Sequence, residues 1–276
     1  MKNSYSIYLI SDSTGETLDR IFLALKAQFE NFDHQVNQFS FTRTETQIKK
    51  IIENAETNKN SIILYTIVNS KLAKFLVEES NKKKIPCFGV LGDLILNFSK
   101  LLNQKASHEP SGQHVLNKEY YDRIEAIQFT MNHDDGKNIE DIEKSDIVLL
   151  GVSRTSKTPT SIYLANRGYK TSNIPLINEK SIPEKMTKLV FKSCVVGLTT
   201  EADRLFDIRK NRLTSLKESE NTEYININEI KKELENSKKI FRKNSWPTID
   251  VTRKSVEETA ASIIKIYEIK NKKCLI

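Results

Sequence analysis

Short apolar runs alternate with amphipathic stretches along the whole chain. The first half contains β-like runs at 6–10, 35–41, 61–67 and 86–90, with helical patterns between them near 15–30, 44–57 and 70–83. The second half repeats this order, with runs at 146–150, 173–176, 195–198 and 248–251 and helical patterns near 158–168, 201–217, 226–242 and 255–270. Strands that alternate with helices are typical of parallel sheets. The pattern therefore predicts an α/β fold of two α/β lobes with mostly parallel sheets.

The stretch between the two halves breaks this rhythm. It holds a turn signal at EPSG, a helix-like EYYDRIEAIQF and the acidic string HDDG. We therefore divide the chain into an N-terminal α/β lobe at 1–105, a connecting segment with the HDDG motif at 106–145, and a C-terminal lobe at 146–276. The C-terminal lobe begins with the clearest candidate for a binding loop.

Two helix starts carry the signature of a capping box, in which a serine and a glutamate three residues later cap each other's backbone. Ser13 with Glu16 is the first pair, and Ser255 with Glu258 is the second. Each pair places polar side chains and backbone N–H groups near the carboxyl end of a predicted strand. Open α/β sheets bind their ligands at that edge.

The stretch LLGVSRTSKTP at 149–159 resembles a phosphate-binding loop of the pattern G-x-x-x-x-G-K-[ST]. Ser156 stands where the pattern has its second glycine, so a side chain crowds the approach to phosphate. Arg154 partly compensates as an additional phosphate donor. A buried strand run precedes the loop, and Pro159 suits the first turn of a following helix. The spacing favours a nucleotide site, and a polar turn that caps a structural helix remains the alternative.

In the nucleotide interpretation, backbone N–H groups face the phosphates, Lys157 supplies charge to the transferring group, and the Thr158 hydroxyl holds Mg²⁺. The candidate nucleotide-binding residues are Gly151, Val152, Ser153, Arg154, Thr155, Ser156, Lys157 and Thr158.

Three carboxylates are candidates for chemistry beside this loop. Asp134 and Asp135 are adjacent in HDDG and could coordinate Mg²⁺ or take a proton from an attacking hydroxyl. An acidic surface turn is the alternative for this pair. Asp12 follows a predicted strand and precedes a predicted helix, so it has the position of an active-site carboxylate or of a helix N-cap.

Composition narrows the class of protein. The chain has 276 residues, of which 38% are hydrophobic and 29% charged, as in globular proteins. No apolar run approaches the roughly 20 residues of a membrane span, and the start has no secretory apolar region. The three cysteines are widely spaced, which predicts neither disulfides nor a zinc site. These features favour the cytoplasm and no membrane partner.

The net charge of +7 could attract nucleic acid. The excess lysines are scattered, as in KKELENSKKIFRKN at 231–244, and no aromatic-basic RNA motif accompanies them. Solvated helix faces explain them better, so we expect no nucleic-acid partner.

Five segments together carry a resemblance to a known family. They are ISDSTGETLDRI at 10–21, EYYDRIEAIQFTMNHDDG at 119–136, DIVLLGVSRTSKTPTSIYLANRGYKTSNIPL at 146–176, IRKNRL at 208–213 and WPTIDVTRKSVEETAASI at 246–263. In this order they resemble the pyruvate, phosphate dikinase regulatory proteins, which are bifunctional kinase/phosphorylases. The resemblance spans almost the whole chain, and Ser156 agrees with this family's form of the loop.

The resemblance implies two opposed reactions. One transfers the β-phosphoryl group of ADP to a threonine of the dikinase and inactivates it, so ADP is the phosphoryl donor and the loop its site. The other uses inorganic phosphate to remove that group and releases pyrophosphate. A sister branch acts on phosphoenolpyruvate synthase, but SDSTGET at 11–17 favours the dikinase as partner. A small-molecule kinase with the same kind of loop is the alternative.

The resemblance also implies roles for residues. We assign Lys157 to the transferring group, rank Asp135, Asp134 and Asp12 in that order as the base, and expect Thr158 and Asp135 to hold Mg²⁺. Arg43, Arg123 and Arg209 are candidates for a second phosphate. The oligomeric state stays open, with a homo-oligomer as one possibility.

Overall fold

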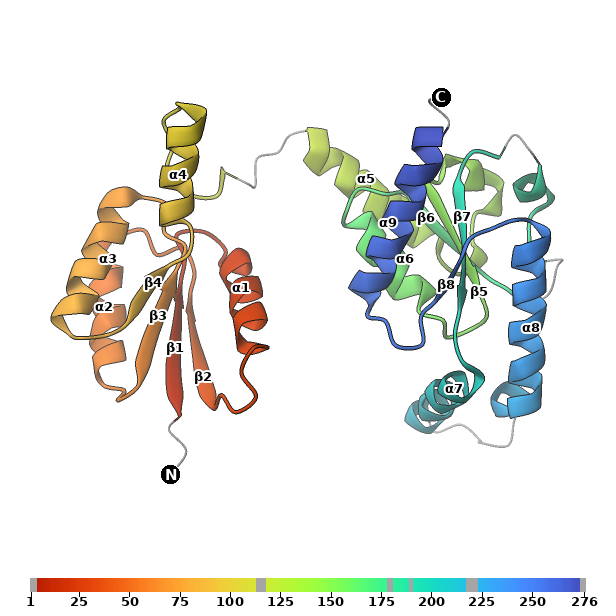
Figure 1. Cartoon of the computed structure of the whole chain (residues 1–276), viewed down its shortest axis with the longest axis horizontal. Helices are drawn as coiled ribbons and strands as arrows, with labels where there is room; N and C mark the ends of the chain where they lie inside the picture. Colours follow the sequence, from red (N-terminus) through yellow and green to blue (C-terminus); the bar gives the residue numbers. More distant parts are fainter. Residues whose placement is uncertain (1–3, 113–117, 178–180, 189–190, 217–222, 274–276) are drawn as a thin grey trace. The chain divides into compact units, whose positions relative to one another are not determined.

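The computed structural model describes residues 4–112, 118–177, 181–188, 191–216 and 223–273. The chain forms two compact units, Met1–Val115 and Leu116–Ile276, and each is described by itself (Figure 1). The division falls inside the stretch 106–145, so the helix and the HDDG turn of that stretch belong to the second unit.

The N-terminal unit is built on a parallel sheet in the order β2-β1-β3-β4. Its strands are β1 (Tyr5–Ile10), β2 (His34–Phe39), β3 (Ser61–Tyr65) and β4 (Cys87–Gly89). Its helices are α1 (Glu16–Lys26), α2 (Glu45–Glu56), α3 (Ser70–Lys82) and α4 (Gly92–Leu102). Tyr8 and Ile10 of β1 face the core under α2 and α3, while Ile7 and Leu9 face α1. The central strand is therefore buried on both faces, as its continuous apolar run predicts.

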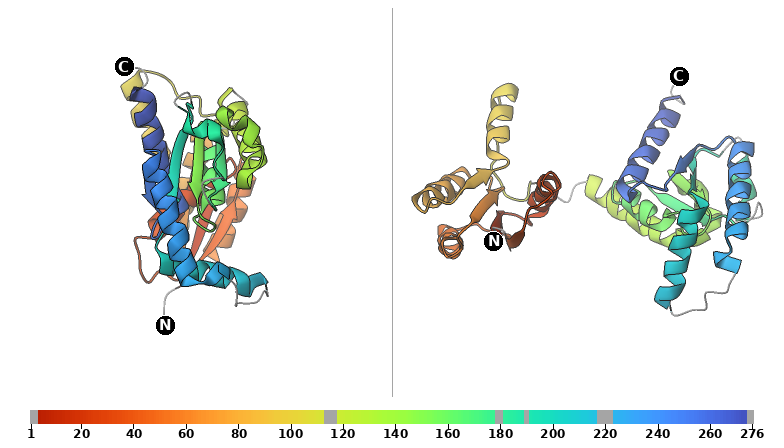
Figure 2. Two further views of the ribbon diagram at one scale, coloured as in Figure 1. Left: turned by 90° about the vertical axis from the view of Figure 1, so that its right-hand side faces the viewer. Right: turned by 60° about the horizontal axis from the view of Figure 1, so that its bottom comes forward.

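The C-terminal unit repeats this plan in the order β6-β5-β7-β8. Its strands are β5 (Ile147–Gly151), β6 (Thr171–Pro175), β7 (Cys194–Thr199) and β8 (Thr248–Asp250). Its helices are α5 (Lys118–Asn132), α6 (Lys157–Ala165), α7 (Ala202–Leu216), α8 (Ile227–Lys243) and α9 (Val256–Lys273). Short 3-10 turns are η2 (Asp134–Gly136), η3 (Ile139–Lys144), η5 (Glu184–Thr187) and η6 (Glu223–Ile225). Figures 1 and 2 show α8 on one face of the sheet and α6 with α9 on the other.

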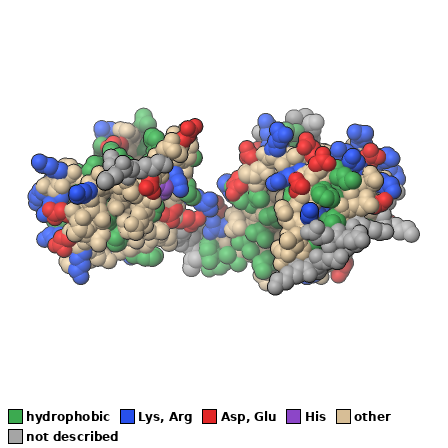
Figure 3. Space-filling view, turned by 90° about the horizontal axis from the view of Figure 1, so that it is seen from below, with side chains coloured by type: hydrophobic (Ala, Val, Ile, Leu, Met, Phe, Trp, Pro, Cys, Tyr) green, Lys and Arg blue, Asp and Glu red, His purple; other side chains and the backbone are tan. Residues whose placement is uncertain are grey.

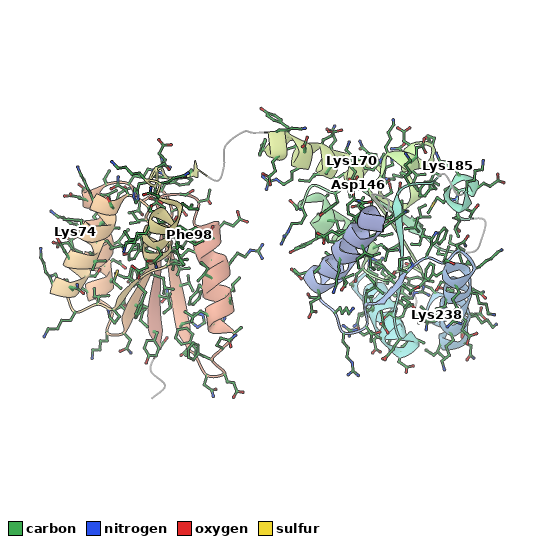
Figure 4. All side chains as sticks on the ribbon, turned by 45° about the horizontal axis from the view of Figure 1, so that its top comes forward. Lys74, Phe98, Asp146, Lys170, Lys185 and Lys238 are labelled. Atoms are coloured by element: carbon green, nitrogen blue, oxygen red, sulfur yellow. The ribbon has the colours of Figure 1, made fainter. Side chains whose placement is uncertain are left out.

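The predicted α/β fold with two parallel sheets is confirmed, and each predicted strand is present within a few residues. Helix α4 was not predicted. Its sequence GDLILNFSKLL places apolar residues at 94, 95, 98, 101 and 102 on one helical face, and Phe98 of that face, labelled in Figure 4, is 59% exposed. None of its residues is buried within the described part of the chain, so its apolar stripe packs into no core there.

One predicted capping box is wrong and the other is confirmed. Helix α1 begins after Gly15, whose left-handed φ of 88° makes it the N-cap, and no described side chain caps it. Ser13 lies too far ahead of this turn to cap α1, and its Oγ lies 2.9 Å from Ser111 Oγ instead. At α9, the N–H of Ser255 donates to Glu258 Oε2 at 2.8 Å, and the N–H of Glu258 donates to Ser255 Oγ at 3.1 Å.

In both sheets the second strand of the unit is added on one side of the first strand, and the third and fourth strands are added on its other side. In each unit the first strand, β1 or β5, lies between the second and third strands of its sheet. The crevice outside the carboxyl ends of β1 and β3, and of β5 and β7, is the position where open sheets of this kind bind ligands.

The surface agrees with the interpretation of scattered charge. On the face drawn in Figure 3, lysine and arginine side chains are interspersed with acidic ones over both units. Within the ranges described above, no helix combines the length and the apolarity that crossing a bilayer requires.

Candidate functional site

The loop between β5 and α6 starts at a glycine that the sheet requires. A Cβ on Gly151 would lie 2.6 Å from Thr155 Oγ1 and 2.8 Å from the carbonyl oxygen of Leu198 in β7. Real Cβ atoms do not approach backbone oxygen so closely. Gly151 therefore allows the loop to leave the sheet edge between β5 and β7, at the expected ligand position.

Two residues of the loop have left-handed backbone. Arg154 has φ 71° and Ser156 has φ 59°, a region that costs an ordinary residue roughly 1–2 kcal/mol. The second glycine of the general pattern stands at position 156 because that backbone suits glycine. Ser156 is the N-cap of α6 but makes no side-chain cap bond. The first N–H groups of α6 therefore have no capping side chain and can serve an anion.

Lys157 lies at the first position of α6 and is folded back into the loop. Its side chain is 7% exposed, and Nζ donates to the carbonyl oxygen of Val152 at 3.0 Å. Burial lowers the pKa of Lys157 to about 8, while Asp135 and Asp134 oppose this shift. A buried ammonium with only one hydrogen bond and two nearby carboxylates retains capacity for a further anionic partner.

The HDDG turn lies beside this lysine, as predicted from its position before β5. Asp134 Oδ1 accepts hydrogen bonds from Thr158 Oγ1 at 2.9 Å and from the Asn173 side-chain amide. The N–H of Asp135 donates to Asn173 Oδ1 at 3.1 Å, and Asp135 itself has a left-handed φ of 57°. The amide of Asn173 thus holds both aspartates at the edge of the sheet.

These groups line one cavity of about 390 Å³. Its walls include Asp134, Asp135, Ser153, Arg154, Ser156, Lys157, Thr158, Pro159, Pro175 and Ile208. Its size lies within the roughly 300–1,000 Å³ of pockets that enclose small organic ligands. Basic and acidic groups therefore converge on one polar cavity at the expected ligand position of the C-terminal sheet.

Comparison with known proteins now decides the family. A family model described as kinase/pyrophosphorylase matches residues 7–264. The chain belongs to the kinase/pyrophosphorylase family. It is accordingly a phosphotransferase.

Three relatives carry the name pyruvate, phosphate dikinase regulatory protein. The one from Pelagibacter ubique is 71% identical over 269 residues, which cover 98% of each chain. The one from Sphingopyxis alaskensis is 45% identical and covers 95% of this chain and 96% of its own. The one from Wolbachia of Brugia malayi is 42% identical and covers 95% of this chain and 97% of its own. The resemblance to that family is therefore confirmed.

Neither Asn173 nor the contacts through which Arg209 holds the loop were identified from the sequence. Asn173 is 1% exposed in the middle of β6, and a polar residue in a buried strand is the signal that could have found it. Arg209 of α7 is 1% exposed and pairs with Glu233 at 2.6 Å. Its Nη1 donates to the carbonyl oxygen of Tyr224 at 3.0 Å.

Arg209 reaches the loop both directly and through Tyr224. Its Nη2 lies 3.4 Å from the Ser153 carbonyl oxygen, and its guanidinium lies over the Tyr224 ring at 4.5 Å. The Tyr224 hydroxyl lies 3.3 Å from Arg154 Nε. The guanidinium of Arg209 is thus engaged in holding the loop. Arg123 is exposed on α5, its guanidinium 5.7 Å from the ring of Tyr120.

The remaining candidates belong to the N-terminal unit. Asp12 follows β1, is 2% exposed, and accepts the N–H of Val68 at 2.8 Å through Oδ2. Arg43 donates from Nε to the Asp12 carbonyl oxygen at 2.9 Å. The structure thus brings Asp134 and Asp135 together with the loop, while Asp12 and Arg43 lie in the other unit.

The donor set at the loop fits Mg²⁺ that is shared with a phosphate. The described residues include no cluster of three or more His, Cys, Asp or Glu side chains suited to a metal. Mg²⁺ commonly uses only one or two carboxylates and completes its shell with phosphate oxygens and water. Thr158 and Asp134, already 2.9 Å apart through their oxygens, offer that kind of pair.

Proposed function

We propose that this phosphotransferase regulates pyruvate, phosphate dikinase by adding a phosphoryl group from ADP to a threonine of the dikinase and by removing it with inorganic phosphate. The observation that carries the proposal is the single cavity lined by Lys157, Thr158, Asp134 and Asp135. The dikinase as partner rests on the names of the relatives, and ADP and phosphate rest on the family resemblance.

The loop would hold the diphosphate of ADP. The first N–H groups of α6 have no capping side chain, and Ser156, Lys157 and Thr158 at this helix start line the cavity, where a helix N-terminus attracts anions. Arg154 lines the same cavity. Lys157 exchanges its bond with the Val152 carbonyl for one with a phosphoryl oxygen, which replaces a neutral acceptor by a charged one.

The kinase step is a transfer between two oxygens. The threonine oxygen of the dikinase attacks the β-phosphorus of ADP, the bond from that phosphorus to the bridging oxygen breaks, and AMP leaves. The threonine proton passes to a carboxylate. Charge on the transferring group is neutralised by Lys157, and such transfers depend mainly on positioning and electrostatics.

The two aspartates have different surroundings, which suggests a division of roles. Asp134 Oδ1 already accepts hydrogen bonds from Thr158 and Asn173, so this oxygen holds those two side chains in place. Mg²⁺, when bound, would be held by Thr158 with Asp134 or Asp135 and would shield charge between phosphates. Asp135 donates only its backbone N–H to Asn173, which leaves its carboxylate to accept the threonine proton. Asp135 therefore ranks first as base, Asp134 second and Asp12 third.

The reverse step needs no base for the nucleophile. An oxygen of inorganic phosphate attacks the phosphorus of phosphothreonine, the bond to the threonine oxygen breaks, and pyrophosphate leaves. The threonine oxygen takes up a proton. The attacking phosphate is already anionic, so Asp135 is less important here than in the kinase step.

Labelled nucleotides test the proposal. ADP that carries ³²P in its β-position should label purified pyruvate, phosphate dikinase on a threonine, while α-labelled ADP should yield labelled AMP and leave the dikinase unlabelled. Addition of unlabelled phosphate should then release labelled pyrophosphate. Label that passes to phosphoenolpyruvate synthase but not to the dikinase would assign the chain to the other target. ATP as the required donor would refute the ADP reaction.

A further inference from the structure

A cavity of about 450 Å³ lies in the C-terminal unit at the amino ends of β7 and β8. The loop after β5 lies at the opposite edge, because all strands of this sheet run parallel. The walls of the cavity come from the start of β7, the turn before β8 and the last turns of α9, and they share no residue with the cavity at Lys157. Its volume lies within the roughly 300–1,000 Å³ of sites that enclose small molecules.

The shortness of β8 explains this space. Strand β8 pairs with β7 only from Gly197 onward, so no strand among the described residues lies beside the start of β7 on that side. The N–H of Gly197 donates to the Pro247 carbonyl oxygen at 2.9 Å, and the N–H of Val195, two residues earlier, points the same way. Val195 is 5% exposed, and within the described ranges this N–H has no acceptor on that side. The gap in the sheet therefore leaves a buried donor to a ligand.

Lys270 of α9 brings positive charge to the same wall. Its Nζ donates to the carbonyl oxygen of Ser193 at 2.7 Å, and none of the described residues that line the cavity is acidic. Lys188 is the other charged residue of the lining. The Ser193 hydroxyl is buried and has no partner in the described part of the chain. An ammonium with one neutral acceptor retains two donors, so the cavity attracts an anion.

The other walls of the cavity are apolar. They are formed by Met186, Phe191, Trp246, Pro247, Ile266 and Ile269. Phe191 and Trp246 also pack against the core on the α8 face of the sheet, and Ile266 packs against the core on the α9 face. These side chains are held by two cores, so they form a fixed surface for an apolar group.

The charge and the walls together define the class of ligand. One carboxylate has two oxygens, which can accept hydrogen bonds from Lys270 Nζ and from the Val195 N–H at the same time. A phosphate dianion would bring a second charge into apolar surroundings, which is costly without a second buried partner. The apolar walls in turn require a hydrocarbon chain or ring attached to the carboxylate.

We propose that the C-terminal unit binds a small monocarboxylate with an apolar tail at the amino ends of β7 and β8. Its carboxylate accepts from Lys270 Nζ and the Val195 N–H, and its tail packs against Trp246 and Ile269. Binding requires neither ADP nor dikinase and uses no residue of the cavity at Lys157. It therefore holds or fails separately from the proposed function.

The fluorescence of Trp246 reports on this cavity, because the chain has one tryptophan. Titration of the full chain with sodium octanoate should give a saturable change in its emission. Octanol, which has the same tail without the charge, should bind at least tenfold more weakly, and octylamine, which has the opposite charge, should not bind. No saturable change with octanoate, or equal affinity for octanoate and octanol, would overturn the proposal.

The contact to the carboxylate is tested at Lys270. Lys270→Met keeps most of the apolar stem and removes the ammonium, so octanoate affinity should fall about tenfold or more, the effect of a lost hydrogen bond between charged groups. Lys265→Met is the matched control, because Lys265 is exposed on the same helix and does not line the cavity. Equal octanoate affinities in the two variants would refute the assignment of Lys270.

A second variant tests the same charge preference without removing a buried contact. Ile269 lines the cavity and is 48% exposed, so Ile269→Glu should leave the fold intact, which a thermal melt checks. The introduced carboxylate repels an anion and attracts a cation, so octylamine should now bind more tightly than octanoate. If Ile269→Glu keeps the octanoate preference of the original chain, the ligand does not occupy this cavity and the proposal is wrong.

Discussion

The loop after β1 in the N-terminal unit and the loop after β5 in the C-terminal unit occupy the same place in two sheets of the same strand order. Each follows the central strand, contains left-handed backbone, and leads into a helix that no described side chain caps. Their charges differ. The C-terminal loop carries buried Lys157, with its carboxylates supplied by a neighbouring turn, whereas the N-terminal loop carries buried Asp12 itself.

This difference separates the contribution of the strand order, which gives the position of a binding crevice, from the contribution of the side chains, which give its charge. The strand order places a crevice at the same edge in both units and supplies helix N–H groups to it. The side chains then set the charge of each loop. A lysine attracts a highly charged diphosphate, whereas a buried carboxylate repels it. The predictions below test what the side chains at the C-terminal loop contribute.

The largest effect is expected from the C-terminal loop. Lys157→Ala should lower the ADP-dependent kinase rate by about 10²–10³-fold, because the ammonium stabilises the transferring phosphoryl group. Kinase assays and thermal melts of the variant would check this. Lys238→Ala is the control, since Lys238, labelled in Figure 4, is exposed on α8. A wild-type rate in Lys157→Ala would remove the loop from the mechanism.

The acidic turn should separate the two directions of the reaction. Asp135→Asn should lower the kinase rate by about 10²-fold or more, the usual range for a general base, and the phosphate-dependent dephosphorylation by less. Asp134→Asn should impair both directions, because it weakens the contacts to Thr158 and Asn173. Initial rates at saturating Mg²⁺ measure both. Equal losses for Asp135→Asn in the two directions would point to a metal ligand instead of a base.

The position of the loop, its lysine and the aspartates of HDDG could be predicted because each belongs to a short contiguous pattern just after or just before the strand β5. Asn173 could not, since it comes from β6 and meets the site only after folding. Arg209 was named as a phosphate candidate, but its contacts to Glu233 and to the loop carbonyl of Ser153 arise only after folding. The cap of α1 was predicted wrongly because the left-handed turn at Gly15 moves the helix start past Ser13. Helix α4 was missed although its apolar residues at 94, 95, 98, 101 and 102 follow one helical face.

A third prediction concerns pH and the buried lysine. The pKa of Lys157 is lowered to about 8 by burial, below the 10.5 of an exposed lysine. As the pH rises above about 8, the folded chain loses the ammonium before it meets ADP, so kcat/KM for ADP should fall. The kcat/KM of Lys157→Arg should stay constant over the same pH range, whatever its absolute value, because a guanidinium stays charged. Parallel profiles of kcat/KM against pH for the two chains would contradict this.

The same shift should affect stability. Between pH 8 and 10.5 the unfolded chain carries the proton of Lys157 while the folded chain has lost it. The free energy of unfolding therefore gains a component that rises with pH in that window. Lys157→Met should lack this component. Denaturant titrations of both chains at several pH values measure the difference, and a constant difference across the window would show that the lysine is solvated.

The smallest effect is expected at Ser156, the residue that departs from the general loop pattern. Its φ of 59° is left-handed, so Ser156→Gly should raise the free energy of unfolding by about 1 kcal/mol through relief of backbone strain. Ser156→Ala keeps the strain and is the control. The Ser156 hydroxyl makes no capping hydrogen bond to the described residues of α6, so ADP affinity should be retained in both variants. A fall in affinity by the roughly 0.5–1.5 kcal/mol of one hydrogen bond in both would show that the hydroxyl binds phosphate, and a serine there would then be a ligand and not a strained substitute for glycine.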